Sequence, residues 1–322
     1  MKKILVTGGA GFIGSNLVER LLSLENIKKV RVLDNFSTGS RANIEGFIGH
    51  PKFELMEGDI RDYTICLAAC EDIDIVSHQA ALGSVPRSIA DPLSTNAVNI
   101  TGTLNIFTAA KETGIKRIVY AASSSTYGDN TELPKLEDRI GKPLSPYAVT
   151  KYVNELYAEV FANLYGMEMI GLRYFNVFGP RQSPNGAYAA VIPLFLKHLL
   201  VNQPPVIHGD GSTSRDFTYI ENVLQANYLA LFTENKAALN QIYNVACGES
   251  TTLNALFETL KNILDTDVVP IYGDNRIGNI AHSLADISKI QDLLGYQPTV
   301  NIEAGLQKTV AWFRHKNKVI ER

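Results

Sequence analysis

A tyrosine and a lysine four residues apart, Tyr147 and Lys151, have the types and spacing needed for proton transfer. On a helix this spacing places both side chains on one face. A lysine ammonium beside the phenol favours the phenolate form, so it is expected to lower a phenol pKa that starts near 10. The pair alone decides little, because a chain of this composition supplies roughly one such pair by chance.

A hydroxyl group is the second requirement, because a substrate oxygen that gives up a proton must also be oriented. The segment Tyr120-Ala-Ala-Ser123 closes a β-branched run and opens a serine cluster. It places Ser123 at the carboxyl edge of a predicted parallel sheet, where doubly wound folds bind ligands. The purely structural alternative, a serine loop and a packed helix, requires Ser123, Tyr147 and Lys151 to meet at that edge by accident.

A glycine-rich turn near the amino terminus indicates the hydride acceptor. Gly8, Gly11 and Gly14 have a spacing that permits a tight turn, close approach of a pyrophosphate and close helix packing. The helix that begins near Phe12 offers its free N–H groups and positive dipole end to phosphates. We therefore expect a dinucleotide here, bound by the three glycines together with Phe12 and Ile13.

The end of the second predicted strand selects between NAD and NADP. The carboxylate of Asp34 can accept from both adenosine ribose hydroxyls and would repel a 2′-phosphate, so NAD is favoured. Arg31 and Arg41 are the nearby candidates for binding a phosphate. Asp59-Ile60 and Ala80-Ala81 follow the third and fourth predicted strands, where loops would line the same crevice.

The elements that must position these residues follow an alternating pattern. Short β-branched runs at residues 4–6, 30–33, 53–56, 73–76 and 117–120 are separated by helical patterns. That rhythm predicts an α/β fold with a doubly wound parallel sheet of the Rossmann type. A helix is expected from Ser145 to about Tyr165, because Ser145-Pro146 is a favourable helix start.

Beyond residue 176 the sequence changes to Gly-, Pro- and Asn-rich loops between short helices. Such loops usually carry binding groups, which predicts a smaller C-terminal α/β lobe that holds the substrate. We place an NAD-binding domain at residues 1–175, with returning segments near 217–246, and the substrate-binding lobe at 176–322.

Composition bounds the function classes. The 322 residues are 45% apolar and carry a net charge of −3 without a basic stripe, so nucleic acid is not an expected partner. No apolar stretch approaches the roughly 18 residues of a membrane helix, so no membrane association is expected. Three cysteines without paired spacing predict no metal site and fit a reducing cytoplasm.

Several motifs in order make the chain resemble the extended short-chain dehydrogenase/reductases, over nearly its whole length. More narrowly, three long segments resemble the bacterial UDP-N-acetylglucosamine 4-epimerases. The motifs shared with the short-chain dehydrogenase/reductases are Gly8-Gly-Ala-Gly-Phe-Ile-Gly14, Leu33-Asp-Asn-Phe36, Gly58-Asp-Ile-Arg61, Tyr147-x-x-x-Lys151 and Leu172-Arg-Tyr-Phe-Asn176. The segments that resemble the 4-epimerases are residues 78–88, 121–128 and 185–193.

The resemblance implies roles for the catalytic group. Tyr147 would act as base at the sugar 4-hydroxyl, Ser123 as its hydrogen-bonding partner and Lys151 as ligand of the nicotinamide ribose. Oxidation at C4 would give a bound 4-keto sugar that turns its other face before hydride returns, so NAD is regenerated and stays bound. Relatives that dehydrate or decarboxylate carry acids after the catalytic hydroxyl, where this chain has Ser124 and Ser125. The resemblance extends the NAD-binding set to Asn35, Asn99 and Tyr174.

Substrate contacts are also implied by the resemblance. Asn176, Arg215 and Arg276 are assigned to the UDP diphosphate, which suits recognition of phosphate oxygens by guanidinium groups. The residue after Gly278 departs from the family pattern, because Asn279 stands where aspartate is common. A further set of small or neighbouring residues is assigned to the sugar, with room for an acetamido group: Gly83, Ser84, Ser124, Ser125, Ala190, Val191 and Ser283.

The sequence therefore predicts a cytoplasmic enzyme, an NAD-retaining 4-epimerase of UDP-N-acetylglucosamine and UDP-N-acetylgalactosamine. The resemblance adds a homodimer built from helices around 96–113 and 145–165. UDP-glucose/UDP-galactose or the uronic acid UDP-N-acetylglucosaminuronate remain alternative substrates. A nucleotide-sensing regulator without turnover is an alternative of another class, disfavoured because a sensor need not keep Ser123, Tyr147 and Lys151.

Overall fold

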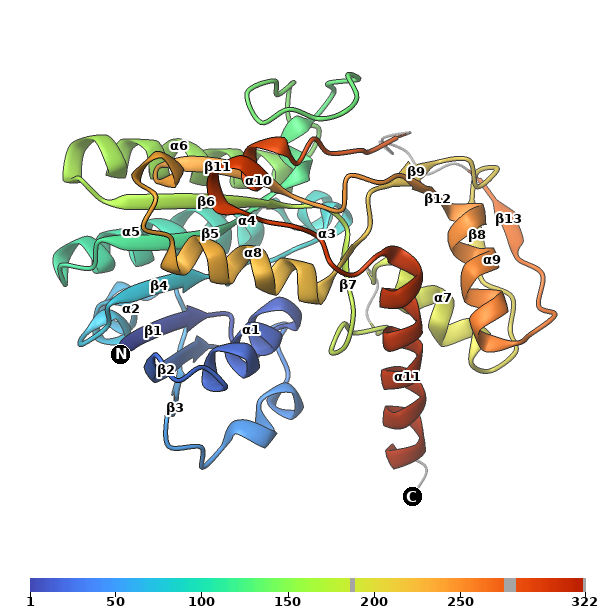
Figure 1. Cartoon of the computed structure of the whole chain (residues 1–322), viewed down its shortest axis with the longest axis horizontal. Coiled ribbons are helices and arrows are strands. Elements are labelled where there is room, and N and C mark those ends of the chain that lie inside the picture. Colours follow the sequence, from blue (N-terminus) through green and yellow to red (C-terminus); the bar gives the residue numbers. More distant parts are fainter. Residues whose placement is uncertain (186–188, 275–281, 321–322) are drawn as a thin grey trace.

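A parallel sheet of seven strands forms the centre of the first lobe (Figure 1). The computed structural model describes residues 1–185, 189–274 and 282–320, with side chains through residue 315. The spatial order is β11-β6-β5-β4-β1-β2-β3, and every pairing is parallel. The predicted doubly wound fold is confirmed. The strands are β1 (Lys2–Thr7), β2 (Ile27–Asp34), β3 (Phe53–Glu57), β4 (Ile75–His78), β5 (Arg117–Ser123), β6 (Glu168–Tyr174) and β11 (Gln241–Val245).

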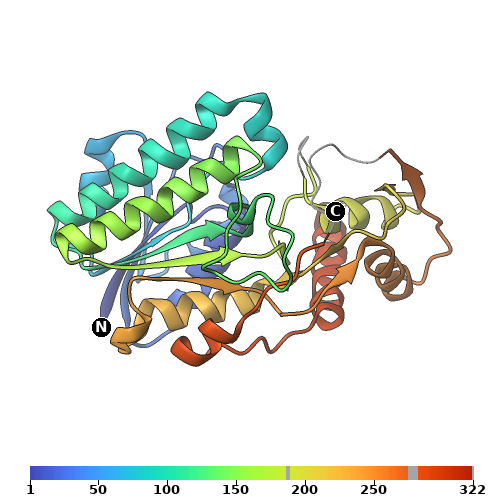
Figure 2. The ribbon, with the colours of Figure 1, turned by 90° about the horizontal axis from the view of Figure 1, so that it is seen from above.

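Helices cover both faces of this sheet, as Figure 2 shows. One face carries α2 (Tyr63–Cys70), α5 (Thr103–Glu112) and α6 (Pro146–Tyr165), and the other carries α1 (Phe12–Leu22) and α8 (Ile220–Phe232). Before α5 the chain runs through α3 (Val85–Ala90), α4 (Pro92–Asn96) and a π-helical turn, Ala97–Gly102. Single 3₁₀ turns occupy Arg41–Asn43, Glu45–Phe47, Ser124–Tyr127 and Lys236–Ala238.

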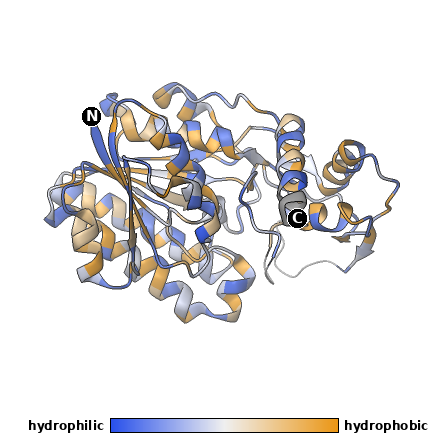
Figure 3. Cartoon of the chain, turned by 90° about the horizontal axis from the view of Figure 1, so that it is seen from below, coloured by the Kyte–Doolittle hydropathy of each residue, from blue (hydrophilic) through white to orange (hydrophobic). Residues whose placement is uncertain are grey.

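The core follows from the burial of strands on both faces, as parallel sheets require. Ile4, Leu5 and Val6 of β1 are fully buried, and the apolar side chains divide into two main clusters. Ile4 and Val6 belong to the cluster that includes α1 and α8, whereas Leu5 belongs to the cluster that includes α2 and α5. The helices carry both hydrophobic and hydrophilic segments (Figure 3), as amphipathic layers do.

Helix α6 has the capping chemistry that its sequence indicates. The Ser145 hydroxyl accepts from the Ala148 N–H at 3.1 Å, Pro146 opens the first turn, and Gly166 ends the helix with a left-handed φ of 63°. A buried ion pair anchors the helix to β6, because Arg173 Nε and Nη2 donate to the two Glu155 carboxylate oxygens at 2.9 and 2.8 Å. Breaking such a pair costs about 3–5 kcal/mol, so α6 is a rigid support.

The second lobe is built from helices and very short strand pairs. Its helices are α7 (Val191–Leu199), α9 (Leu253–Leu264) and α11 (Ile302–Ile320), and α10 (Ser288–Leu294) lies back against β11 and α8. The pairs are β7 (Val177–Phe178) with β10 (Thr218–Tyr219), β9 (Ser214–Arg215) with β12 (Thr251–Thr252), and β8 (Val206–His208) with β13 (Ile271–Gly273).

Between the segments of the second lobe the chain returns to the first. Helix α8 packs on the central sheet, and β11 pairs with β6 at its edge. The domain boundaries stay a prediction. Among the described residues, no helix is both long and apolar enough to cross a membrane.

Candidate active site

The glycine turn after β1 has no space for side chains at two positions. Gly8 has a φ of +69°, and a Cβ there would lie 2.7 Å from the Ala80 backbone nitrogen. A Cβ at Gly14 would lie 2.1 Å from the Gly8 carbonyl oxygen. Because only glycine accepts both the left-handed conformation and this close approach, the turn follows from the sequence.

The turn leads into a helix whose first N–H groups are uncapped by side chains. Gly11 is the N-cap residue of α1 and provides no side-chain acceptor. The helix dipole and the free donors at this end suit phosphate oxygens. The cradle therefore fits the pyrophosphate of a dinucleotide.

Asp34 ends β2 beside this turn. Its Oδ2 accepts from the Ala10 N–H at 2.9 Å and its Oδ1 accepts from the Phe36 N–H at 2.8 Å. Burial raises the pKa of Asp34, and the two backbone donors lower it. Each oxygen keeps a further lone pair, so the contact between this carboxylate and the ribose hydroxyls is possible and stays a prediction.

The two arginines considered for a 2′-phosphate both have other partners. Arg31 donates to Glu54 and to backbone carbonyls of residues 68, 69 and 71. Arg41 pairs with Glu57, and its guanidinium carbon lies 4.2 Å from the centre of the Phe36 ring. These pairings favour NAD over NADP, in agreement with Asp34.

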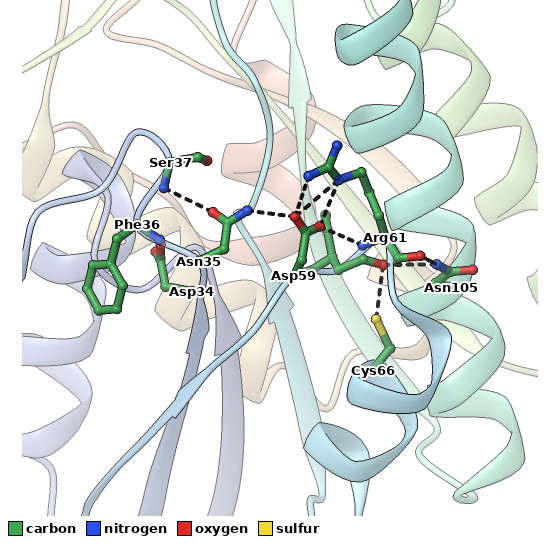
Figure 4. Close-up of polar contacts among 9 residues, drawn as sticks. Asp34, Asn35, Phe36, Ser37, Asp59, Arg61, Cys66 and Asn105 are labelled. Carbon is green, nitrogen blue, oxygen red and sulfur yellow. Dashed lines mark hydrogen bonds and ion pairs between the residues drawn. The ribbon is translucent and has the colours of Figure 1, made fainter.

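A polar chain joins the ends of β2 and β3 (Figure 4). Asn35 Nδ2 donates to Asp59 Oδ2 at 2.8 Å, and Arg61 Nη2 donates to the same oxygen at 2.7 Å. The Arg61 hydrogen bond is the main cause that lowers the pKa of Asp59 to about 2. Asn105 and Cys66 both donate to the Ile60 carbonyl, so the loop is held from behind.

These strand ends surround a cavity of about 350 Å³, which we call the cofactor cavity. It contains nearly all of the residues predicted to bind NAD, together with the three predicted catalytic residues. The predicted residues in its lining are Gly8, Gly11, Phe12, Ile13, Gly14, Asp34, Asn35, Asp59, Ile60, Ala80, Ala81, Gly83, Ser123, Tyr147, Lys151 and Tyr174.

Asn99 lies behind this lining. Its Oδ1 accepts from the Leu82 N–H at 2.8 Å, and its Nδ2 donates to the Leu82 carbonyl at 3.1 Å and to Thr150 Oγ1. It therefore fixes a residue of the cofactor cavity to the helix that carries Tyr147 and Lys151.

The catalytic candidates differ from the expectation in one respect. Lys151 Nζ donates to the Ala121 carbonyl at 2.8 Å, and burial lowers its pKa to about 8. The pKa of Tyr147 is raised, not lowered, because burial disfavours the phenolate more than the hydrogen bond with Ser123 favours it. The lysine alone does not produce the expected downward shift.

Ser123 holds its position through the serine cluster that follows it. Its hydroxyl accepts from the Ser125 N–H at 3.2 Å and from the Ser125 hydroxyl at 2.9 Å. Ser124 and Ser125 line neither the cofactor cavity nor the second cavity, which lies in the C-terminal lobe. Ser84 also lies outside both linings, because its hydroxyl caps α3 by accepting from the Arg87 N–H.

Sequence reasoning missed a buried histidine beneath the glycine turn. His78 Nδ1 lies 2.8 Å from Thr7 Oγ1, and His78 Nε2 lies 2.9 Å from Thr103 Oγ1. Thr7 Oγ1 also accepts from the Ala80 N–H. Burial, with a smaller effect of Lys151, lowers the pKa of His78 to about 3. A histidine at the end of a buried strand was the available signal.

A second cavity of about 280 Å³ lies in the C-terminal lobe, and we call it the substrate-side cavity. Of the residues predicted to bind substrate, Asn176, Val191 and Arg215 line it. Arg215 Nη1 donates to the Ser214 carbonyl at 2.7 Å, and burial lowers the pKa of Arg215. The remaining lining residues were not predicted: Leu194, Phe195, His198, Pro205, Val206, His208, Thr213, Phe217 and Leu253.

The other predicted substrate residues have different positions. Ala190 is the N-cap residue of α7, next to Val191 of the substrate-side cavity. The Ser283 N–H donates to the Ser214 carbonyl at 3.1 Å, which places Ser283 beside β9. Arg276 lies outside the described residues. In the described part of the chain, no group of three or more His, Cys, Asp or Glu side chains gathers as a metal site.

Fold and cavity together are those of a dinucleotide-dependent enzyme, and a tyrosine, a lysine and a serine line the cofactor cavity. Comparison identifies the family: residues 4–246 match the NAD dependent epimerase/dehydratase family, and the chain belongs to it. NAD is its cofactor, and the expectation of an epimerase-type enzyme is confirmed by its relatives.

Three relatives illustrate the similarity. A UDP-glucose 4-epimerase of Mycolicibacterium smegmatis is 35% identical, over 98% of this chain and 100% of the relative. The solved UDP-N-acetylglucosamine 4-epimerase of Methanobrevibacter ruminantium, in complex with UDP-N-acetylmuramic acid, is 41% identical with a TM-score of 0.92, over 98% and 99% of the two chains. The UDP-glucose 4-epimerase of Thermus thermophilus with NAD is 35% identical with a TM-score of 0.86, over 97% and 99%.

Proposed function

We propose that this chain interconverts UDP-N-acetylglucosamine and UDP-N-acetylgalactosamine by NAD-dependent epimerisation at C4. The observation that carries the proposal is the shared cavity, because Ser123, Tyr147 and Lys151 line the same space as the glycine turn and Asp34. Proton transfer from the sugar 4-hydroxyl and hydride transfer from C4 can therefore take place in the same space. The relatives named as UDP-sugar 4-epimerases support this reaction type.

Each catalytic residue has a distinct task in the proposed reaction. Tyr147 removes the proton of the sugar 4-hydroxyl, and Ser123 hydrogen-bonds the same oxygen while it becomes a ketone. Lys151, held by the Ala121 carbonyl, presents a positive charge to the nicotinamide ribose. Bound NAD would supply the hydride acceptor and a positive charge that favours the phenolate form of Tyr147. After the 4-keto sugar has turned its other face, C4 would take the hydride back and the phenol would return its proton to the 4-oxygen, so that no net oxidation remains.

The remaining NAD contacts are proposed from the cavity lining. Phosphates would lie at the Gly11 end of α1, and the adenosine ribose at Asp34 and Asn35. Adenine would lie at Asp59 and Ile60. These assignments rest on positions at the carboxyl ends of β1, β2 and β3, where dinucleotides bind in this fold.

Space for an acetamido group supports the choice of sugar. Gly83 lines the cofactor cavity, and a Cβ added there would meet nothing within 4 Å. Ser283, which the resemblance assigns to the sugar, is a small residue beside β9 and leaves room for an acetamido group. Plain UDP-hexoses remain the second candidate, because the Mycolicibacterium smegmatis and Thermus thermophilus relatives are named UDP-glucose 4-epimerases.

Product analysis tests the proposal directly. Purified protein without added cofactor is incubated separately with UDP-N-acetylglucosamine, UDP-glucose and UDP-N-acetylglucosaminuronate, and the products are resolved by chromatography. The highest kcat/KM is expected with UDP-N-acetylglucosamine. Preference for either other sugar would transfer the assignment to that substrate, and no conversion of any would refute the epimerase proposal.

A homodimer is proposed from an apolar strip on α6 and its neighbours. Val160 and Leu164 on α6 are 45% and 70% exposed, and Leu93 on the adjacent α4 is 81% exposed. Val160 and Leu164 are four residues apart and so share one face of the helix, and monomeric proteins rarely expose contiguous apolar patches larger than a few hundred Å²; we therefore expect a second copy of the chain to cover this face. Sedimentation should give the mass of two chains, and Leu93→Glu combined with Leu164→Glu should give monomers.

A further inference from the structure

Asp216 is a fully buried carboxylate between two residues of the substrate-side cavity. It follows Arg215 at the end of β9 and precedes Phe217, and both neighbours line the cavity. Its exposed fraction is 0%. A carboxylate in such a position is costly unless its oxygens are hydrogen-bonded, so its partners define its role.

Three backbone N–H groups from two separate segments donate to this side chain. Cys247 N–H donates to Oδ1 at 2.9 Å, and Gly248 N–H donates to Oδ2 at 3.0 Å. Ala285 N–H donates to Oδ2 at 3.2 Å. The first two belong to the loop that follows β11, and the third belongs to the segment that contains Ser283. Asp216 thus ties both segments to the β9–β10 connection.

Hydrogen bonds of the backbone around Asp216 also reach other residues that are proposed to bind the substrate. Asn176 Nδ2 donates to the Asp216 carbonyl at 3.1 Å, and the Thr218 N–H donates to the Asn176 carbonyl at 3.3 Å. Two residues earlier, the Ser214 carbonyl accepts from the Ser283 N–H and from Arg215 Nη1. The diphosphate and sugar candidates therefore share one hydrogen-bonded frame.

We propose that Asp216 is a positioning residue for the UDP-sugar: its carboxylate holds the 247–248 loop and the 283–285 segment in register with Arg215 and Asn176. The inference rests on the proposed function, because it names how that substrate site is assembled. Only a carboxylate offers two acceptor oxygens here. An amide of the same size would direct an NH₂ group at backbone donors and leave at least one of them unpaired.

Asp216→Asn is the direct test. We expect KM for UDP-N-acetylglucosamine and the Kd for UDP, measured by calorimetry, to rise about tenfold or more. The kcat should stay within about threefold, and the NAD content should be unchanged, because Asp216 does not line the cofactor cavity. Unchanged KM and Kd, or loss of kcat and NAD instead, would overturn the inference.

Glu249→Gln provides the matched control. It makes the same carboxylate-to-amide change on an exposed residue next to Gly248, and should leave KM and Kd near the wild-type values. Binding of UDP separates the two proposals. Wild-type protein that binds UDP but converts no sugar would refute the epimerase proposal alone, whereas equal UDP binding by wild type and Asp216→Asn would refute the positioning role alone.

A measurement on the wild-type protein covers the case in which Asp216→Asn does not fold. Burial raises the pKa of Asp216 to about 6, the three backbone bonds oppose this, and Glu249 adds to it. Other titratable groups near it are Arg215, Cys247, Tyr296 and, through Ser214, His282. Because this pKa lies above the ordinary carboxyl value, protonation below about pH 6 favours the closed arrangement over any opened form in which Asp216 is solvated.

Amide hydrogen exchange measures this effect at the three donors themselves. After correction for intrinsic rates, protection of the Cys247, Gly248 and Ala285 amides should rise together, about tenfold, between pH 7 and pH 5, because an opened form exposes Asp216 with its ordinary, lower pKa. Equal protection at both pH values would contradict the positioning role. This readout needs no substrate, so it also decides the inference if UDP does not bind.

Discussion

The two cavities of this molecule are built in different ways. The cofactor cavity collects residues at the carboxyl ends of consecutive parallel strands, so each motif lies next to the strand that positions it. The substrate-side cavity collects residues from 176 to 253 that are joined by strand pairs of two or three residues. A local motif is therefore sufficient to build the first cavity, whereas the second depends on long-range hydrogen bonds such as those of Asp216.

The largest expected effect is a loss of kcat without a loss of bound NAD, within the cofactor cavity. Tyr147→Phe removes the proposed base and should lower kcat about 10³-fold, while bound NAD stays at the wild-type level. Turnover of UDP-N-acetylglucosamine and NAD released on denaturation measure the two quantities. Tyr152→Phe, on the same helix but outside the cofactor cavity, is the control. A loss of less than tenfold in Tyr147→Phe would remove the tyrosine from its role.

A glycine substitution tests whether the cofactor cavity depends on its local turn. Gly14→Ala places a methyl group 2.1 Å from the Gly8 carbonyl oxygen, so the turn must shift. We expect NAD affinity to fall about 10- to 100-fold, which corresponds to overpacking in a tight site. Gly46→Ala meets nothing within 4 Å and should bind NAD normally. Full NAD retention by Gly14→Ala would show that the turn is more tolerant than its geometry indicates.

A larger side chain in place of Ser283 tests the proposed sugar specificity. Ser283→Tyr should reduce kcat/KM for UDP-N-acetylglucosamine about tenfold more than for UDP-glucose, because the acetamido group needs the space and the plain hydroxyl does not. The NAD content should be unaffected, since Ser283 does not line the cofactor cavity. Equal losses on both sugars would remove Ser283 from the specificity argument.

The smallest expected effect lies at the rim of the cofactor cavity. Arg61→Gln removes the main cause that lowers the pKa of Asp59 to about 2. Because the folded pKa lies below the ordinary value, the pair stabilises the fold above about pH 4 and loses this effect as pH falls toward 2. The pair is partly exposed, so urea unfolding at pH 7 should show a loss of no more than about 1 kcal/mol. A loss that is equal at pH 7 and pH 3 would contradict the ion-pair explanation.

The sequence predicted the sheet and the cofactor cavity because both are encoded in short stretches. The spacing of the glycines and of Asp34 after the second strand identifies the dinucleotide motif. Ser145-Pro146 marks the start of α6. His78 was missed because its meaning depends on Thr103, which lies 25 residues away. The spacing of Tyr147 and Lys151 gave the phenol a neighbour but not its burial, and burial raises the pKa of Tyr147 in the structure.

Most of the substrate-side cavity could not be predicted for a related reason. Phe195 and His208 belong to different short elements, and no periodic pattern links them. Resemblance supplied Asn176 and Arg215, but not the buried Asp216 that connects them to the rest of the lobe.

The return of the chain to the first sheet has a consequence for how this protein can be divided. Helix α8 buries Ile220, Val223 and Ala226 in the apolar cluster that also contains residues of β1 and α1. Strand β11 forms the edge of the sheet beside β6. A fragment that ends at residue 175 would therefore lack helix α8 on one face of the sheet and the edge strand β11. The remaining piece would contain α8 without the sheet on which its apolar face packs. The two lobes therefore cannot be exchanged between proteins by a single cut. A chimera must take α8 and β11 from the same parent as residues 1–175.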